Sequence, residues 1–312
     1  MICTVTLNPA LDRTLQVENF AVGQHARAKL FSLIPAGKGI NVARGLSRLG
    51  QAPIACGLVG RGECETYRKA LNEDEVRCEL TSLEGITRTN TTILDPERST
   101  TTHLREEGFS VKTDDIRRLT DHIRGVLDAH EGAKQVVFTG SLPPGISDSA
   151  FIDILQECHR AGAELTVDTS GTALRRAALS GVVDTVKPNL NELGQCLGRE
   201  VGRTESIEAA REILDRVKTV LLTLGEEGAY VVRRKGVEGI RCRLKSGELQ
   251  STVGCGDAFL AGWLSAMAEG KSPLEALSWA VAAGAASARG ETAVDYTRHD
   301  VEELSARCGP LQ

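Results

Sequence analysis

The sequence predicts an α/β fold with a mostly parallel central sheet, helices on both faces of that sheet and a small accessory sheet. Two observations indicate the central sheet. Short runs of β-forming residues alternate along the chain with longer amphipathic segments, and these short runs are apolar throughout. Strands that are covered by helices on both faces have this character. A third observation indicates the accessory sheet, because two regions are short, alternating and rich in Thr and Arg.

The expected strands of the central sheet are short runs with many β-branched side chains. In chain order they are Cys3–Leu7, Gln135–Thr139, Glu164–Asp168, Thr219–Leu224 and Ala229–Arg234. The expected helices include Ile40–Leu49, Asp114–Ala129, Asp148–Arg160, Ile207–Val217, Asp257–Ala268 and Pro273–Ala288. In the first of these helices, Val42, Leu46 and Leu49 recur at helical spacing and form one apolar stripe.

The accessory strands come from about residues 12–33 and 86–106, which interrupt the alternation of strands and helices. The stretch Asn90–Leu104 has the pattern of a hairpin whose turn lies around Asp95–Arg98, with Pro96 in the turn. We expect these strands to form a lid over the ends of the main strands. No Ser/Gly linker or repeat divides the chain, so residues 1–312 are expected to form a single domain.

Composition and charge exclude several classes of function. The formal net charge of −5 argues against binding to nucleic acid or to an anionic membrane surface. No apolar run reaches the roughly 18 residues that a membrane span needs, and the first residues lack the pattern of a signal peptide. The nine cysteines are odd in number and form no C-x-x-C pair, which indicates reduced thiols in a cytoplasmic protein.

Glycine clusters near residues 37 and 254 do not fit the common nucleotide-binding motifs. The Walker pattern fails around Lys38, and the dinucleotide fingerprint fails at both Gly37 and Gly254. A nicotinamide-dependent oxidoreductase is therefore not indicated.

The segment Ser251–Trp263 (STVGCGDAFLAGW) places Asp257 between a glycine-rich loop and a helix that is apolar on nearly every face. The N-terminus of a helix attracts anions through its unpaired N–H groups and its dipole. A carboxylate beside such a site is the arrangement that phosphoryl transfer requires, with the carboxylate taking the proton of the attacking hydroxyl. The alternative interpretation is that Asp257 only caps its helix, since Asp is a favoured N-cap residue.

The remaining motifs, taken in order, resemble those of the PfkB/ribokinase family of sugar kinases. They are TLNPALD (6–12), PAGKGINVARGLSRLG (35–50), TRTN (87–90), GSLPPG (140–145), VDTSG (167–171), VKPNLNE (186–192), TLGEEGA (223–229) and TVGCGDAFLAG (252–262). The resemblance covers nearly the whole chain and implies a ribokinase-like three-layer α/β/α fold. TLNPALD, GKGIN and GSLPPG together resemble the phosphosugar branch of this family.

The resemblance implies roles for residues on the acceptor side. Asp257 matches the catalytic base, and the backbone amides of Gly254, Cys255 and Gly256 match the anion hole. Cys255 stands where the family usually has alanine, and its alternative interpretation is a small buried apolar residue. The residues implied to bind the phosphosugar are Asp12, Gly37, Lys38, Gly39, Asn41, Arg88, Asn90, Arg27, His103, Arg105 and Ser141. Alternatively, Arg27, His103 and Arg105 lie on a solvated face, and Asp12 and Ser141 belong to turns.

The resemblance also implies a nucleotide side that binds ATP and Mg²⁺. Its residues would be Lys187, Asn189, Glu192, Thr223, Gly225 and Ser287. Asn189 and Glu192 match the element that organises Mg²⁺, largely through water, and Mg²⁺ needs few protein oxygens. Read alone, Glu192 is an ordinary acid in the first turn of a helix. The family also places a monovalent-cation site near residues 282–295, so a monovalent cation is an additional candidate cofactor.

The expected reaction is transfer of the γ-phosphoryl group of ATP to a hydroxyl of a ketohexose phosphate. Lys38 in the G-K-G form favours fructose 1-phosphate, which would give fructose 1,6-bisphosphate. Fructose 6-phosphate and tagatose 6-phosphate remain alternatives, as do an unphosphorylated sugar or nucleoside and a non-catalytic sugar-phosphate sensor. Relatives pair through the lid, so a homodimer is a further expectation.

Overall fold

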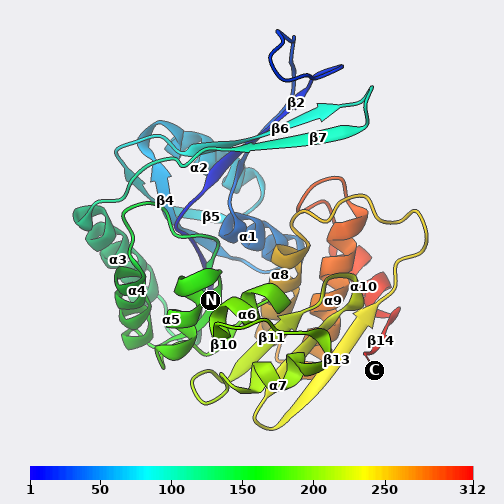
Figure 1. Ribbon diagram of the computed structural model, residues 1–312. Coiled ribbons are helices and arrows are strands. Elements are labelled where there is room, and N and C mark those ends of the chain that lie inside the picture. Colours follow the sequence, from blue (N-terminus) through cyan, green and yellow to red (C-terminus); the bar gives the residue numbers. More distant parts are fainter. Residues whose placement is uncertain (312) are drawn as a thin grey trace.

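The computed structural model describes residues 1–311 and contains a ten-stranded sheet with helices on both faces (Figure 1). The strand order is β14-β13-β12-β11-β10-β9-β8-β1-β4-β5. The strands are β1 (Ile2–Thr6), β4 (Ile54–Gly60), β5 (Arg77–Leu83), β8 (Lys134–Thr139), β9 (Ala163–Asp168), β10 (Thr185–Val186), β11 (Thr219–Thr223), β12 (Ala229–Arg233), β13 (Gly236–Cys242) and β14 (Cys308–Pro310). The predicted α/β architecture is confirmed.

One edge of this sheet departs from the expected parallel arrangement. The seven strands that lie in the order β5-β4-β1-β8-β9-β10-β11 are parallel to one another. Beyond β11, the pairs β11–β12, β12–β13 and β13–β14 are antiparallel. The connection between β11 and β12 is a short turn around Gly225–Glu227. A crossover between parallel strands needs a dozen or more residues, so this turn can only form a hairpin.

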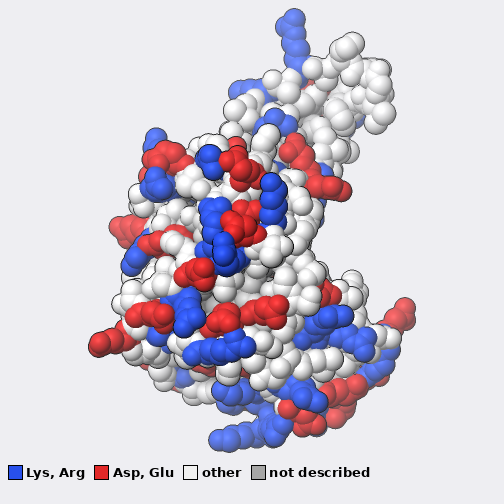
Figure 2. Space-filling model, turned by 90° about the vertical axis from the view of Figure 1, so that its left-hand side faces the viewer, with Lys and Arg blue, Asp and Glu red and all other residues white. Residues whose placement is uncertain are grey.

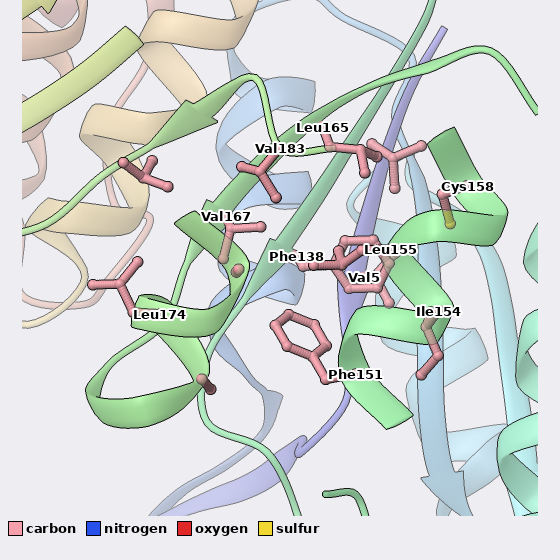
Figure 3. Close-up of a cluster of buried hydrophobic side chains, with 14 of the residues drawn as sticks. Val5, Phe138, Phe151, Ile154, Leu155, Cys158, Leu165, Val167, Leu174 and Val183 are labelled. Atoms are coloured by element: carbon pink, nitrogen blue, oxygen red, sulfur yellow. The ribbon is translucent and has the colours of Figure 1, made fainter. Parts of the chain in front are cut away.

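The two faces of the sheet are covered by different helices. One face packs against α3 (Thr113–Asp128), α4 (Asp148–Arg160), α5 (Gly171–Leu179), α6 (Leu190–Leu197) and α7 (Ser206–Arg211). The other packs against α1 (Lys38–Arg48), α2 (Cys64–Glu73), α8 (Cys255–Ala268), α9 (Pro273–Arg289) and α10 (Arg298–Ser305). Figure 3 shows the first core, where Phe138 of β8 meets Phe151 of α4 edge to face, with ring centroids 5.7 Å apart. Such close packing fixes the strand ends that carry the polar motifs.

Helix α8 is almost entirely buried, as its sequence predicts. Ten of its residues, from Asp257 to Ala266, are inaccessible or nearly so. It packs closely on α9, and a Cβ atom at Gly262 would lie 2.8 Å from the Cβ of Ala283. The helix predicted over Ile207–Val217 is shorter, because α7 ends at Arg211 and continues as turns with i→i+3 hydrogen bonds. Those turns bury Leu214 and Val217, which preserves the apolar pattern of the sequence.

The accessory strands form a separate four-stranded sheet that projects from the body, and we call it the lid (Figure 1). Its order is β3-β2-β6-β7, with β2 (Ala10–Gln16), β3 (Lys29–Ala36), β6 (Arg88–Asp95) and β7 (Thr100–Arg105). Strands β6 and β7 form the predicted hairpin with Pro96 in its turn. The Asp95 carboxylate accepts hydrogen bonds from the amides of Asn19 and Phe20 and from those of its own turn, which holds the tip together.

Among residues 1–311, no helix is both long and apolar enough to span a membrane. Within the same residues all nine cysteines are free thiols.

Candidate active site

The N-terminus of α8 is open and lies against a buried carboxylate. Gly254 is the N-cap residue with φ 78°, and no side chain caps the helix. A Cβ atom at Gly254 would lie 2.4 Å from the Cβ of Ala293, so only glycine fits both this backbone conformation and this space. Asp257 is the third residue of the helix and is 6% exposed. The interpretation of Asp257 as the N-cap is therefore wrong, and the first amides of α8 are available to an anion.

Asp257 is held in place from α1. The side-chain amide of Asn41 donates a hydrogen bond of 2.9 Å to Oδ2 of Asp257. Burial raises the pKa of Asp257 to about 6, although Asn41 and two nearby lysines, Lys38 and Lys187, act in the opposite direction. A carboxylate with a pKa near neutrality is suited to take a proton from a hydroxyl and release it later.

The loop before α1 lies directly against β1, which places Lys38 and Asn41 beside Asp257. A Cβ atom at Gly39 would lie 2.4 Å from Oγ1 of Thr6, so this close approach of α1 to β1 requires glycine. Gly37, the N-cap residue of α1, also contacts Thr6. The sequence thus brings the 37–41 loop and the α8 terminus to the same end of the sheet.

Two lysines from opposite sides of the site meet at a carboxylate that sequence reasoning missed. Asp168 ends β9 and is 1% exposed. Its Oδ1 lies 3.2 Å from Nζ of Lys187, and its Oδ2 lies 3.8 Å from Nζ of Lys38. Asp168 is the first cause of the raised pKa of Lys38, so this lysine stays charged. The signal was present in the sequence, because Asp168 closes a buried strand at the edge where ligands bind in α/β sheets.

Lys187 connects this ion cluster to the anion site. It is 5% exposed, and a Cβ atom at Gly256 would lie 3.6 Å from its Nζ. The first turn of α8 therefore presents free amides and a buried ammonium group to the same space. That combination favours a phosphate group over a neutral ligand.

The predicted acceptor residues of the lid form one row across its strands. Asp12 pairs in register with Asn90, which pairs in turn with Arg105. The Asn90 amide donates a hydrogen bond of 2.9 Å to Oδ1 of Asp12. Arg88 lies two residues from Asn90, hence on the same face of the sheet. His103 lies two residues from Arg105 and hydrogen-bonds to Thr92 at 3.1 Å.

The two arginines of this row lie close enough to repel each other. After desolvation, Arg105 is the largest cause of the lowered pKa of Arg88, which Asp12 partly offsets. The Arg88 guanidinium donates to the backbone carbonyls of Asn8 and Pro9, at 3.1 and 3.3 Å, which fixes its position. Two neighbouring cations are suited to bind an anion.

Two other predicted acceptor residues lie in different places. Ser141 follows β8 at the site end of the sheet, and its hydroxyl accepts a hydrogen bond of 3.1 Å from the Asn8 amide. Arg27 is not near the others. The pairing of β2 with β3 ends at Gln16 and Lys29, and Arg27 lies beyond that pair. Asp12 pairs with Ile34, which is closer to the body. The last lid pair lies about 13 Å along the strand from Asp12, and Arg27 precedes that pair outside the strand.

The predicted nucleotide side is centred on the start of α6. Asn189 and Glu192 form a reciprocal capping box, with both side-chain-to-backbone bonds at 2.9 Å. Thr223 lies beside them through a bridge to Asn189. Gly225 follows at the exposed end of β11.

Cys255 and Ser287 pack behind the anion site. The Ser287 side chain is fully buried, and its hydroxyl donates to the carbonyl of Ala293 at 3.1 Å. Ser287 therefore supports the 290–295 loop from beneath. Burial raises the pKa of Cys255, so its thiol is protonated at neutral pH, in line with its interpretation as a small packing residue.

The residues of this site suit Mg²⁺ held mainly by water and phosphate. Within residues 1–311, no group of three or more His, Cys, Asp or Glu side chains is arranged to hold a metal by itself. Mg²⁺ typically keeps several waters and takes one or two carboxylates plus substrate phosphates. Glu192 lies near Lys38, since it contributes to the raised pKa of that lysine, and can serve as such a carboxylate.

A groove on the surface lies elsewhere. It has a volume of about 490 Å³ and is lined by residues 214–219 and 233–235 at the opposite end of the strands. It contains none of the predicted site residues.

An α/β fold that gathers a buried carboxylate, an open helix terminus and a cationic lid at one sheet end defines a phosphotransferase with an alcohol group as acceptor. More specifically, the chain belongs to the pfkB family of carbohydrate kinases, whose family model matches residues 5–297.

Individual relatives agree with this assignment. A 1-phosphofructokinase of Rhodobacter capsulatus is 34% identical, with 85% of this chain and 83% of the relative covered. A 1-phosphofructokinase of Xanthomonas campestris is 32% identical, with 87% and 86% covered. Phosphofructokinase-2 of Escherichia coli in complex with potassium is 27% identical, with a TM-score of 0.90 and 98% of each chain covered. The same enzyme has been solved with substrates and products and in a tetrameric inhibited form.

Proposed function

We propose that the protein is an ATP-dependent 1-phosphofructokinase, which transfers the γ-phosphoryl group of ATP to a hydroxyl of fructose 1-phosphate. The observation that carries the proposal is the position of Asp257, buried at the open N-terminus of α8 and held by Asn41. Relatives that cover most of the chain are named 1-phosphofructokinase, which supports this acceptor. In the 37–41 loop, Lys38 between Gly37 and Gly39 is the residue that favours fructose 1-phosphate as the acceptor.

In the proposed reaction, Asp257 accepts the proton of the attacking hydroxyl as that oxygen approaches phosphorus. The amides of Gly254, Cys255 and Gly256 stabilise the charge on the transferred phosphoryl oxygens, with Lys187 beside them. Mg²⁺, placed near Asn189 and Glu192 through water, would neutralise charge on the nucleotide phosphates. A monovalent cation is a further proposed cofactor, supported by the potassium complex of the Escherichia coli relative.

On the acceptor side, Asp12 and Asn90 would hold sugar hydroxyls while Arg88 and Arg105 bind the existing phosphate. The hydrogen bond between Asp12 and Asn90 and the fixed guanidinium of Arg88 support this division of roles. The lid would close over the acceptor and exclude water, which could otherwise take the phosphoryl group.

We also propose that two copies pair through their lids. On the face that Figure 2 shows, the upper part of the lid carries few charged side chains, in contrast to the mixed charges of the body. The exposed apolar residues of the lid strands and of the 17–28 loop include Val22, Leu30, Phe31, Leu33 and Leu104. Strand β3 is an edge of its sheet and could pair with a second chain.

The test of the acceptor is steady-state kinetics with purified protein, ATP and a panel of acceptors, with ADP release as the readout. We expect kcat/KM for fructose 1-phosphate to exceed that for fructose 6-phosphate and tagatose 6-phosphate by at least about 100-fold, because a displaced phosphate leaves Arg88 and Arg105 unpaired. Ribose and adenosine are the unphosphorylated controls. A preference for any other acceptor would contradict the proposed substrate, and no ADP release with the whole panel would favour a sugar-phosphate sensor.

A further inference from the structure

Two cysteines far from the candidate active site face each other across the antiparallel edge of the main sheet. Cys242 ends β13 and pairs directly in register with Cys308, the first residue of β14. Directly opposed residues on antiparallel strands have Cα atoms about 4.5–5.5 Å apart, within the range that a disulfide spans. The Cys242 thiol donates a hydrogen bond to the carbonyl of Leu304, and the Cys308 thiol donates one to the carbonyl of Ser278. Formation of a bond between them therefore requires little movement of the backbone.

The surroundings of this pair favour a reactive thiolate. Cys308 is partly exposed, whereas Cys242 is buried. The neighbouring Cys308 thiol lowers the pKa of Cys242, with further help from Arg307 and Arg289, and burial opposes the effect. The neighbouring Cys242 thiol and burial raise the pKa of Cys308, so the first thiolate of the pair forms at Cys242.

A second pair of neighbouring thiols lacks these properties and provides an internal control. Cys3 and Cys56 lie on the adjacent parallel strands β1 and β4, where Cys3 pairs with Ile54 and Cys56 with Val5. Both are fully inaccessible to solvent. The neighbouring Cys3 thiol and burial raise the pKa of Cys56, and neither sulfur is open to an oxidant from solvent.

We propose that Cys242 and Cys308 are an oxidisable dithiol that hydrogen peroxide converts into an intramolecular disulfide. The thiolate of the pair attacks one peroxide oxygen, which breaks the O–O bond and yields a sulfenic acid and, after protonation, water. The second sulfur then displaces the sulfenic oxygen as water, and the S–S bond forms. Overall, two thiols lose two electrons and two protons to one peroxide molecule, which gives one disulfide and two waters. A dithiol reductant reverses the change.

The bond would link the C-terminal strand to the strand that precedes the anion site. Residues 243–254 connect Cys242 to Gly254, and within that loop both carboxylate oxygens of Glu248 lie 3.1 Å from Arg307, the neighbour of Cys308. The disulfide therefore adds a covalent link where an ion pair already joins the same two segments. Because it closes a loop that contains α8, α9 and α10, we expect the oxidised protein to melt several degrees higher than the reduced protein.

The test treats the reduced full-length protein with hydrogen peroxide and counts its thiols after denaturation. We expect the count to fall from nine to seven, the mass to fall by about 2 Da, and peptide mapping to join residues 242 and 308. Dithiothreitol should restore both values. Cys308→Ser should abolish the mass loss, whereas Cys3→Ser should retain it.

Several results would overturn the proposal. They are a disulfide between other cysteines, a loss of about 2 Da in Cys308→Ser, or no cross-link at peroxide concentrations that oxidise glutathione at the same pH. Should Cys308→Ser fail to fold, wild-type protein alkylated before oxidation replaces it as the control. A melting temperature that peroxide leaves unchanged would also count against a disulfide between residues 242 and 308. This modification does not depend on the identity of the acceptor, so its failure would leave the proposed kinase activity untouched.

Discussion

Asn41 and Asp257 are joined by a hydrogen bond of 2.9 Å although 216 residues separate them in the chain. Asn41 lies in the first turn of α1, beside the acceptor loop, and Asp257 lies in the first turn of α8, beside the anion site. The bond therefore fixes the proposed base relative to both substrates. It also satisfies one oxygen of a carboxylate that burial would otherwise leave unpaired.

Burial of Asp257 favours catalysis at the expense of stability. Its pKa rises from 3.8 to about 6 on folding. Because the folded value lies above the unfolded one, the folded protein binds more protons in this range. The free energy of unfolding therefore falls as the pH rises from about 4 to about 6 and stays low above that.

We expect Asp257→Asn to remove this effect and to stabilise the ligand-free protein by about 1–3 kcal/mol at pH 7.5. The asparagine carbonyl can still accept the hydrogen bond from Asn41. Urea unfolding at pH 5 and pH 7.5 checks this, and the stabilisation should be smaller at pH 5. Asp121→Asn, on the exposed face of α3, is the control and should unfold like the wild type at both pH values. A variant less stable than wild type at pH 7.5 would contradict the assignment of the raised pKa.

The lid arginines should determine acceptor affinity without affecting ATP. We expect Arg88→Ala and Arg105→Ala each to raise KM for the phosphosugar about 10- to 100-fold, because each removes a charge-assisted hydrogen bond to phosphate. KM for ATP should change little. Arg13→Ala is the control, since Arg13 lies on the opposite face of the same sheet and bonds to Thr91. Equal effects on both substrates would remove these arginines from the acceptor site.

Substitutions at two glycines, at opposite ends of α8, can distinguish the effect of backbone strain from the effect of close packing. Gly254 and Gly270 have φ values of 78° and 76°, but only Gly254 has neighbours that a Cβ atom would strike. We expect Gly270→Ala to cost about 1 kcal/mol and to leave kinetics unchanged.

Gly254→Ala carries the same backbone cost and must also displace the loop around Ala293. We expect it to destabilise the protein by at least about 2 kcal/mol and to lower kcat at least about tenfold, since the amides of the anion site move. Thermal unfolding and steady-state kinetics of the two variants provide the comparison. If both variants behaved alike, the contact with Ala293 would have no role in shaping the site.

Local motifs predicted much of this molecule because each serves a local need. The buried character of α8 and the lid hairpin at Pro96 follow from patterns within a few residues. The grouping of Lys38 and Asn41 with Asp257 was implied by the resemblance of their motifs to those of the family. The start of α8 was misplaced by two residues, because Gly254 adopts a left-handed conformation and becomes the N-cap. A carboxylate at that point fits either a cap or a base, and only tertiary structure distinguishes them.

Features that depend on distant parts of the chain could not be predicted in the same way. Asp168 gains its role from Lys38, which begins α1, and from Lys187, which follows β10. These two lysines reach the end of β9 only in the folded structure. The position of Arg27 depends on the pairing of β2 with β3, since alternation in sequence does not show how far a strand pair extends. The antiparallel direction of β12 was accessible in principle, because its connection is too short for a crossover.

The most direct test of Asp257 as the catalytic base is the turnover number of Asp257→Asn at saturating ATP and phosphosugar, with ATP affinity measured in parallel by calorimetry. Without a group to accept the proton, we expect kcat to fall by about 10²- to 10⁴-fold. ATP affinity should stay close to that of the wild type, because the amides of the anion site are unchanged. A folded variant that turns over within about tenfold of the wild-type rate would show that another group takes the proton.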